Sequence, residues 1–165
     1  MSEQVLDVCC GSRMFWFNRT DPRALYLDNR RETHHLTDKS SKGGSRMLTI
    51  DPDQLADFTA LPFSNDSFAM VVFDPPHLTR NGARGWQAKK YGKLEGDWEG
   101  MLRRGFLECF RVLRPYGTLI FKWSEHEIPV SRILALTTER PLVGQRCGKA
   151  SKTHWLVFMK SQVSP

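Results

Sequence analysis

Residues 68–77 read FAMVVFDPPH, a short apolar run that ends in an acid, two prolines and a histidine. The run is rich in Val and Phe, which predicts a buried strand. Two successive prolines have no N–H to donate, so they end the ladder of hydrogen bonds and stiffen the turn that follows. The pattern therefore delivers the carboxylate of Asp74 to the carboxyl end of a strand, which is where open α/β sheets bind their ligands.

The chain is short enough for one domain. Its 165 residues can build one core but leave little room for a second module. No apolar run approaches the roughly 18 residues that a membrane span needs, and residues 1–4 do not resemble a signal peptide. The four cysteines lack zinc-type spacing. We therefore expect a reduced, cytoplasmic protein with no bound metal and no membrane partner.

Apolar runs alternate with helical or irregular connections over most of the chain. The apolar stripe in residues 102–113 predicts a helix, and Arg114-Pro115-Tyr116-Gly117 would stop it. This alternation predicts an α/β domain with a mainly parallel sheet, to which a C-terminal hairpin would add an antiparallel edge strand. Further strands are expected at residues 5–8, 24–27, 47–50, 118–123 and 154–159, and a short helix at 130–136.

The first predicted strand leads into Asp7-Val8-Cys9-Cys10-Gly11-Ser12-Arg13. This segment resembles the cofactor loop of class I S-adenosylmethionine-dependent methyltransferases, written D-x-G-x-G-x-G. In such loops a tight turn brings backbone N–H groups against the cofactor. Here only Gly11 remains of the three glycines, with Cys9 at the first position and Arg13 at the third. The pattern leaves open whether Arg13 contacts the carboxylate of the cofactor or a phosphate of the substrate.

Three more segments follow in the order of the same family. Asp28 lies 21 residues after Asp7, where an acid accepts hydrogen bonds from ribose hydroxyls. Asp57 falls where an acid of the family contacts the adenine amine, and residues 108–117 resemble the family's E-x-x-R-V-L-x-P-x-G segment. The resemblance spans roughly residues 5–160. It implies a Rossmann-like class I methyltransferase fold in one minimal domain, residues 1–165. It also implies S-adenosylmethionine as cofactor, bound by Asp7, Cys9, Gly11, Asp28, Asp57 and Asp74.

The turn Asp74-Pro75-Pro76-His77 resembles the [D/N/S]-P-P-[Y/F/W/H] motif of amino-methyltransferases, which methylate planar nitrogens such as the exocyclic amines of adenine and cytosine. With D-x-C-C-G-S near its start, the chain also resembles very small methyltransferases of phages and prophages. The resemblance implies that all four residues of the turn are catalytic. Asp74 and the Pro75 carbonyl would accept hydrogen bonds from the amine, and His77 would stack on the base. The alternative is a strand-ending turn with a capping carboxylate.

Two long segments carry much of the charge of a chain whose formal net charge is +6. Cations favour polyanions, because each phosphate contact releases counterions, but a basic protein with no nucleic-acid role is equally compatible with the charge alone. Residues 29–46 contain several cations and His34-His35, whose spacing alone does not indicate a metal. Residues 78–100 interleave cations with rings, a pattern suited to a polynucleotide; the alternative is two solvated loops. The expected substrate-binding residues are Arg80, Arg84, Trp86, Lys89, Lys90, Tyr91 and Lys93.

The sequence thus predicts an S-adenosylmethionine-dependent methyltransferase that acts on adenine N6 or cytosine N4 of DNA or RNA. A base in a duplex would have to be flipped into the site. Because the chain has no separate reading domain, a homodimer or a recognition partner could supply specificity. Two other functions stay open. One is methyl transfer to a protein glutamine or a small molecule, and the other is a catalytically degenerate protein that binds cofactor, nucleic acid or a partner.

Overall fold

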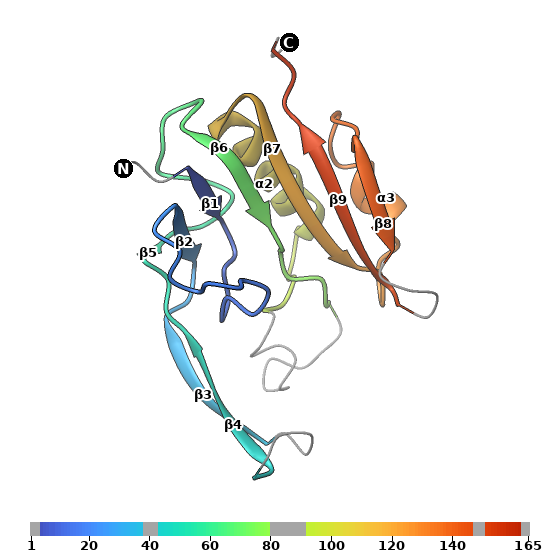
Figure 1. The fold of residues 1–165 in the computed structure, drawn as a ribbon. Helices are drawn as coiled ribbons and strands as arrows, with labels where there is room; N and C mark the ends of the chain where they lie inside the picture. The colour runs from blue at the N-terminus through green and yellow to red at the C-terminus, as the bar shows by residue number, and fades with distance from the viewer. Residues whose placement is uncertain (1–3, 38–42, 80–91, 147–150, 163–165) are drawn as a thin grey trace.

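A computed structural model describes residues 4–37, 43–79, 92–146 and 151–162. Its centre is a seven-stranded sheet with the strand order β5-β2-β1-β6-β7-β9-β8 (Figure 1). The strands are β1 (Val5–Asp7), β2 (Ala24–Asp28), β5 (Gln54–Leu55), β6 (Phe68–Phe73), β7 (Leu113–Ser124), β8 (Val143–Arg146) and β9 (Thr153–Met159).

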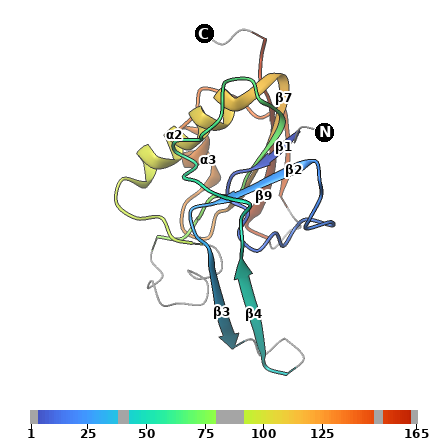
Figure 2. The ribbon, with the colours of Figure 1, turned by 90° about the vertical axis from the view of Figure 1, so that its left-hand side faces the viewer.

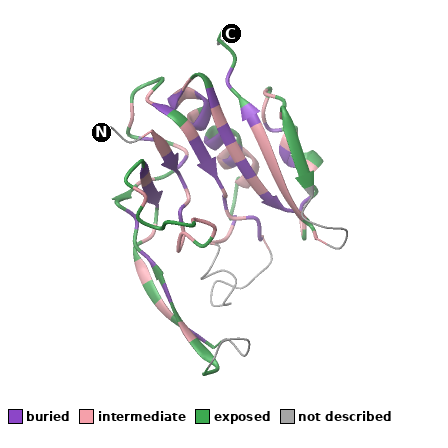
Figure 3. Ribbon diagram, viewed as in Figure 1, coloured by how far each residue is buried: buried purple, intermediate pink, exposed green. Residues whose placement is uncertain are grey.

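The sheet confirms the predicted fold class. The strands from β5 to β7 pair in parallel, and β9 pairs antiparallel with both of its neighbours, β7 and β8. The predicted C-terminal hairpin is present as β8 and β9, and it forms one edge of the sheet. β8 comes first in the chain and is the edge strand, running parallel to β7. β9 follows it and lies between β8 and β7. Figure 3 shows the consequence, with β8 exposed and β9 mostly half-buried.

Two described helices, α2 (Trp98–Val112) and α3 (Val130–Leu134), pack on one face of the sheet (Figure 2). The sequence predicted α2 from residue 102, but the helix begins four residues earlier because Asp97 caps it by accepting a hydrogen bond from the Gly100 N–H at 3.0 Å. The apolar stripe of α2 packs against β6, β7 and β9 to form the main core. Its central aromatic residues are Phe73, Phe106, Phe121, Trp123 and Phe158.

The segment predicted as a long basic loop, residues 29–46, forms much of a β-hairpin instead. Strands β3 (Glu32–Thr37) and β4 (Ser45–Ile50) pair antiparallel as a separate two-stranded sheet that projects from the body of the domain (Figure 1). Leu36 and Leu48 are buried on one face of the hairpin, while Met47 is exposed on the other. Burial that alternates with a period of two is typical of a strand. The many charged residues of the segment hid this pattern in the sequence.

The E-x-x-R segment has a structural role in this fold. Arg111 donates hydrogen bonds to the carbonyls of Leu61 and Phe63 at 2.9 and 2.7 Å and to the carboxylate of Glu108. Glu108 also accepts the Leu61 N–H at 2.7 Å. The guanidinium of Arg111 lowers the pKa of Glu108. The pair fastens the irregular segment before β6 to helix α2, and so fixes where β6 begins.

Along the part of the chain that the structure describes, no helix is both long and apolar enough to span a bilayer.

Candidate active site

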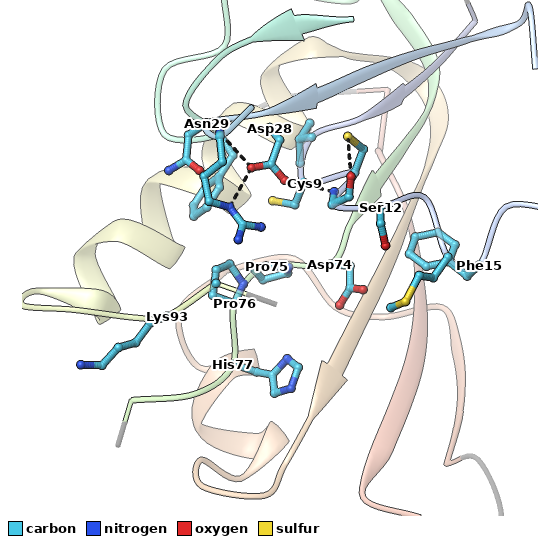
Figure 4. A pocket seen from close by; sticks show the side chains of 17 residues that line it. Cys9, Ser12, Phe15, Asp28, Asn29, Asp74, Pro75, Pro76, His77 and Lys93 are labelled. Carbon is cyan, nitrogen blue, oxygen red and sulfur yellow. Dashed lines mark hydrogen bonds and ion pairs between the residues drawn. The ribbon is translucent and has the colours of Figure 1, made fainter. Parts of the chain in front are cut away.

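The carboxyl ends of β1, β2 and β6 meet at one pocket (Figure 4). It is lined by residues 8–12, 14, 15, 28–30, 58, 74–77, 92 and 93. The predicted cofactor loop and the predicted catalytic turn therefore face the same space, although more than 60 residues separate them in sequence. Parallel strands cause this meeting, because their carboxyl ends share one edge of the sheet.

The loop after β1 turns tightly around its single remaining glycine. Gly11 has a φ of +50°, a left-handed conformation that favours glycine. Its N–H donates to the carboxylate of Asp28 at 3.0 Å, and the Cys10 N–H donates to the carbonyl of Leu27 at 2.8 Å. Burial raises the pKa of Cys9 well above its usual value, so this thiol lines the pocket as a neutral group.

Arg13, the residue in place of the third glycine, fastens the loop to a neighbouring segment. It also has a positive φ, 54°. Its guanidinium donates to the carbonyls of Arg19 and Asp51 at 2.7 and 2.8 Å and pairs with the carboxylate of Asp53 at 2.9 Å. The same group lies over the ring of Tyr26, 3.8 Å from its centroid. The partners of Arg13 are thus other residues of this chain, whereas the sequence left open a contact to the cofactor or to a substrate phosphate.

Asp28 lies at the carboxyl end of β2 and lines the pocket, where the sequence expected a contact to ribose. One carboxylate oxygen accepts the Gly11 N–H, and the other accepts the backbone N–H and the Nε–H of Arg30 at 3.0 and 3.1 Å. Arg30 also lines the pocket and pairs with Glu32 at 3.4 Å. Asp28 therefore joins the first loop, the end of β2 and a cation at one wall of the pocket.

Asp7 supports the loop from beneath and does not line the pocket. It is fully buried, and its carboxylate accepts the indole N–H of Trp16 at 2.7 Å and the Cys9 N–H at 3.2 Å. Burial, with smaller contributions from the charges of Asp74 and Asp28, raises the pKa of Asp7 to about 7. The two hydrogen bonds act in the opposite direction and lower this pKa.

Asp57, a predicted cofactor ligand, is exposed and is not among the residues that line the pocket. Its carboxylate accepts the N–H and the hydroxyl of Thr59, both at 2.8 Å, and so closes a local turn. The next residue, Phe58, is buried and contributes an aromatic wall instead. The apolar residue between Asp57 and Thr59 was the sequence signal available for this wall.

The turn after β6 carries Asp74 into the pocket, as predicted. Asp74 accepts a hydrogen bond at 2.7 Å from the ammonium of Lys122, a residue of β7 that sequence reasoning missed. His77 is 8% exposed, and its ring lies edge-on to that of Trp123 at 6.1 Å between centroids. Burial lowers the pKa of His77, which favours a neutral imidazole at pH 7. In Figure 4 it lies across the turn from Asp28.

Chain segments on both sides hold the turn in place. The N–H and hydroxyl of Thr79 donate to the carboxylate of Glu127 at 2.7 and 2.6 Å. On the other side, the Leu94 N–H donates to the carbonyl of Leu78 at 2.9 Å. As a result, the segment that begins at residue 92 lies beside the turn of residues 74–77.

Gly92 is the close contact between this returning segment and the turn. It has a φ of +75°, and an added Cβ would lie 2.9 Å from Cγ of Pro76. We expect Gly92→Ala to destabilise the protein by about 1–3 kcal/mol more than Gly96→Ala. Gly96 is the matched control, because it also has a positive φ, +55°, but nothing lies within 4 Å of its added Cβ. Urea unfolding measures both variants, and equal losses would show that only backbone strain matters.

Most of the predicted substrate-binding residues, namely Arg80, Arg84, Trp86, Lys89, Lys90 and Tyr91, lie outside the described residues. Lys93 is described, lines the pocket and pairs with Glu95 at 3.4 Å. Within the described ranges, no group of three or more His, Cys, Asp or Glu side chains could hold a metal ion.

No family model and no curated protein matches this sequence. Solved structures do match its fold. A SAM-dependent methyltransferase from Methanosarcina mazei is 12% identical with a TM-score of 0.56, covering 97% of this chain and 93% of that one. The N-methyltransferase NodS from Bradyrhizobium japonicum is 13% identical with a TM-score of 0.54, covering 97% and 86%. The 16S rRNA N2 G1207 methyltransferase RsmC from T. thermophilus, in complex with AdoMet and guanosine, is 13% identical with a TM-score of 0.52, covering 100% and 37%. The chain therefore has the fold of the S-adenosylmethionine-dependent methyltransferases.

Proposed function

We propose that this chain is an S-adenosylmethionine-dependent methyltransferase that methylates an exocyclic amino nitrogen, adenine N6 or cytosine N4, of DNA or RNA. One observation carries the proposal. The Asp74-Pro75-Pro76-His77 turn lines the same pocket as the loop of residues 8–12 and as Asp28. The carboxylate of Asp74 and the carbonyl of Pro75 would therefore lie beside a cofactor bound by that loop.

The charges around the pocket fit a cationic cofactor. Asp28 and Asp74 line the pocket of a chain with net charge +6, and each is also paired with a cation, Arg30 and Lys122. Asp7 lies beneath the loop, and because its pKa is raised to about 7, it adds only part of a negative charge at pH 7. Phe58 offers an apolar ring beside them. When bound, S-adenosylmethionine supplies an electrophilic methyl group on a positively charged sulfur. In this proposal Cys9, Gly11 and Asp28 hold the cofactor directly, and Asp7 acts by shaping the loop.

Asp74 and the turn provide the acceptor chemistry. An exocyclic amine is a poor nucleophile because its lone pair is delocalised into the ring. A carboxylate that accepts the amine's N–H directs that lone pair and raises its electron density. The Pro75 carbonyl is a second acceptor on the same stiff turn. His77, which hydrogen-bonds to the backbone of Pro75, would help to orient that carbonyl. Most of the rate enhancement is then orientation, and no strong base is needed before methyl transfer.

A nucleic-acid acceptor agrees with the basic charge of the chain and with the cations at the pocket, Arg30 and Lys93. One structure with this fold acts on 16S rRNA, and another is an N-methyltransferase. Arg80, Arg84, Trp86, Lys89, Lys90 and Tyr91 remain proposed contacts to the polynucleotide.

One observation favours a second candidate, a non-catalytic binding protein. The carboxylate of Asp28 already accepts three hydrogen bonds from Gly11 and Arg30. A carboxylate has about four acceptor positions, so about one remains, and a second ribose hydroxyl would have to share or displace one of these donors. If it cannot, the pocket would bind the cofactor weakly.

The test is methyl transfer from labelled S-adenosylmethionine to separate pools of duplex DNA, single-stranded DNA, RNA and protein. We expect label in at least one nucleic-acid pool, and digestion to nucleosides then names the methylated base. Asp74→Ala serves as the blank, because it keeps the fold but removes the acceptor carboxylate. Cofactor binding without label in any nucleic-acid pool would overturn the proposal. Label in the protein pool would instead support a glutamine acceptor.

A further inference from the structure

Lys122 is the charged group closest to the proposed catalytic carboxylate. Its ammonium lies 2.7 Å from Oδ2 of Asp74, and the two side chains are only 20% and 15% exposed. The sheet fixes this contact, because Phe73 of β6 is paired with Phe121 of β7. Asp74 directly follows β6, and Lys122 is the next residue of β7. The pair is therefore a built feature of the strand ends and not a chance surface contact.

Two aromatic rings flank the ammonium of Lys122. The ring centroids of Phe15 and Trp155 lie 5.6 and 5.7 Å from its Nζ atom. The two rings are edge-to-face, 5.5 Å apart, and both residues are only partly buried. Phe15 also lines the pocket (Figure 4). The acid, the ammonium and two partly exposed rings thus share one side of the turn, whereas His77 is buried against Trp123.

This arrangement places a hydrogen-bond donor beside an acceptor. An ammonium has three N–H donors, and Asp74 accepts one of them. Adenine and cytosine each present an amino group next to a ring nitrogen that accepts, so the amine would meet Asp74 and the ring nitrogen would meet Lys122. Guanine presents its amine between a ring N–H, which would oppose the ammonium, and the ring acceptor N3, so this contact disfavours only the Watson–Crick edge of guanine. Enzymes that act on a flipped base read this edge by such hydrogen bonds.

We propose that Lys122 recognises the acceptor base, by holding Asp74 and by donating to the ring nitrogen beside the target amine. The acceptor then presents a ring acceptor beside its amine, as the Watson–Crick edges of adenine and cytosine do, with Phe15 and Trp155 forming the apolar wall beside it. This inference rests on the proposed function and names the residue that would read the base.

The test is a cycle that combines an enzyme variant with a base analogue. Single-stranded oligonucleotides carry one target adenine, or 1-deazaadenine, which keeps the amine but lacks the ring nitrogen; 3-deazacytosine serves the same purpose for cytosine. For the wild type we expect kcat/KM to fall by about 10- to 100-fold with the analogue, because a hydrogen bond to a charged group is lost. For Lys122→Met we expect at most an about twofold difference between base and analogue, since the donor is already absent.

Two further variants make the cycle specific. Lys122→Arg keeps a donor beside Asp74 and should restore part of the discrimination between base and analogue. Lys152→Met removes one positive charge from an exposed position and should discriminate as the wild type does. Equal losses in the wild type and Lys122→Met would overturn the recognition role alone. If the wild type methylated no nucleic acid, the proposed function would fail and this inference with it.

Discussion

The contribution of one buried carboxyl to the free energy of unfolding is expected to fall by about 4 kcal/mol as the pH rises from 4 to 8. Asp7 is fully buried, and burial raises its pKa from an ordinary value of 3.8 to about 7. Between these two values the unfolded chain has lost a proton that the folded protein still holds. Stability from this group is therefore fully present below pH 4 and is lost as the pH rises to 7 and above.

Urea unfolding of the wild type and Asp7→Asn at several pH values between 4 and 8 checks this expectation. The asparagine does not ionise, so its oxygen can accept from Trp16 at every pH, while its amide group opposes the Cys9 N–H. The opposed amide should lower the free energy of unfolding of the variant by the same amount at every pH. The variant should not show the further decrease with rising pH that the carboxyl of Asp7 causes. The difference between the two proteins should therefore change with pH. Parallel stability curves would show that Asp7 ionises in the folded protein as it does in the unfolded chain.

The fold could be predicted because its signals are local. The apolar run of β6, the prolines that end it and the stripe of α2 each determine one element, and the order of elements then determines a parallel sheet. The same logic located the pocket, since residues at the carboxyl ends of β1, β2 and β6 must meet. The resemblance to methyltransferase motifs pointed to Cys9, Gly11, Asp28 and the turn from Asp74 to His77, and in the structure all of them line one pocket.

The contacts that the sequence did not reveal join residues far apart in the chain. Lys122 and Asp74 are 48 residues apart, and Arg13 and Asp53 are 40 apart. Alternation within β7 could have placed Lys122 opposite the buried Phe121 and Trp123, but nothing in the sequence states which side chain it meets. Asp57 shows the reverse error, because an acid at the expected place was assigned to the pocket although the Asx turn to Thr59 occupies its carboxylate.

Removing the Asp74 carboxylate is expected to lower the rate of methyl transfer by about 10²- to 10³-fold, the usual cost of losing one preorganised hydrogen-bonding group at a reacting centre. Asp74→Asn should lose less than Asp74→Ala, because an amide oxygen can still accept from the amine or from Lys122, but not from both in the present arrangement. Single-turnover kinetics with saturating cofactor measures the chemical step. Asp57→Ala is the matched control, since it removes an exposed carboxylate that lies outside the pocket lining.

The alternative for Asp74, a carboxylate that only ends a strand, makes a different prediction for the same variants. Asp74→Ala leaves the ammonium of Lys122, 20% exposed, without its partner, so some loss of stability is expected in either case. A purely structural Asp74 would lower activity only through the fraction of unfolded protein, which urea unfolding measures independently. Activity per folded molecule would then stay near that of Asp57→Ala. A deficit of 10²-fold or more that persists after this correction, in the order Ala below Asn below wild type, is expected if the carboxylate takes part in methyl transfer, either on the amine itself or by holding Lys122.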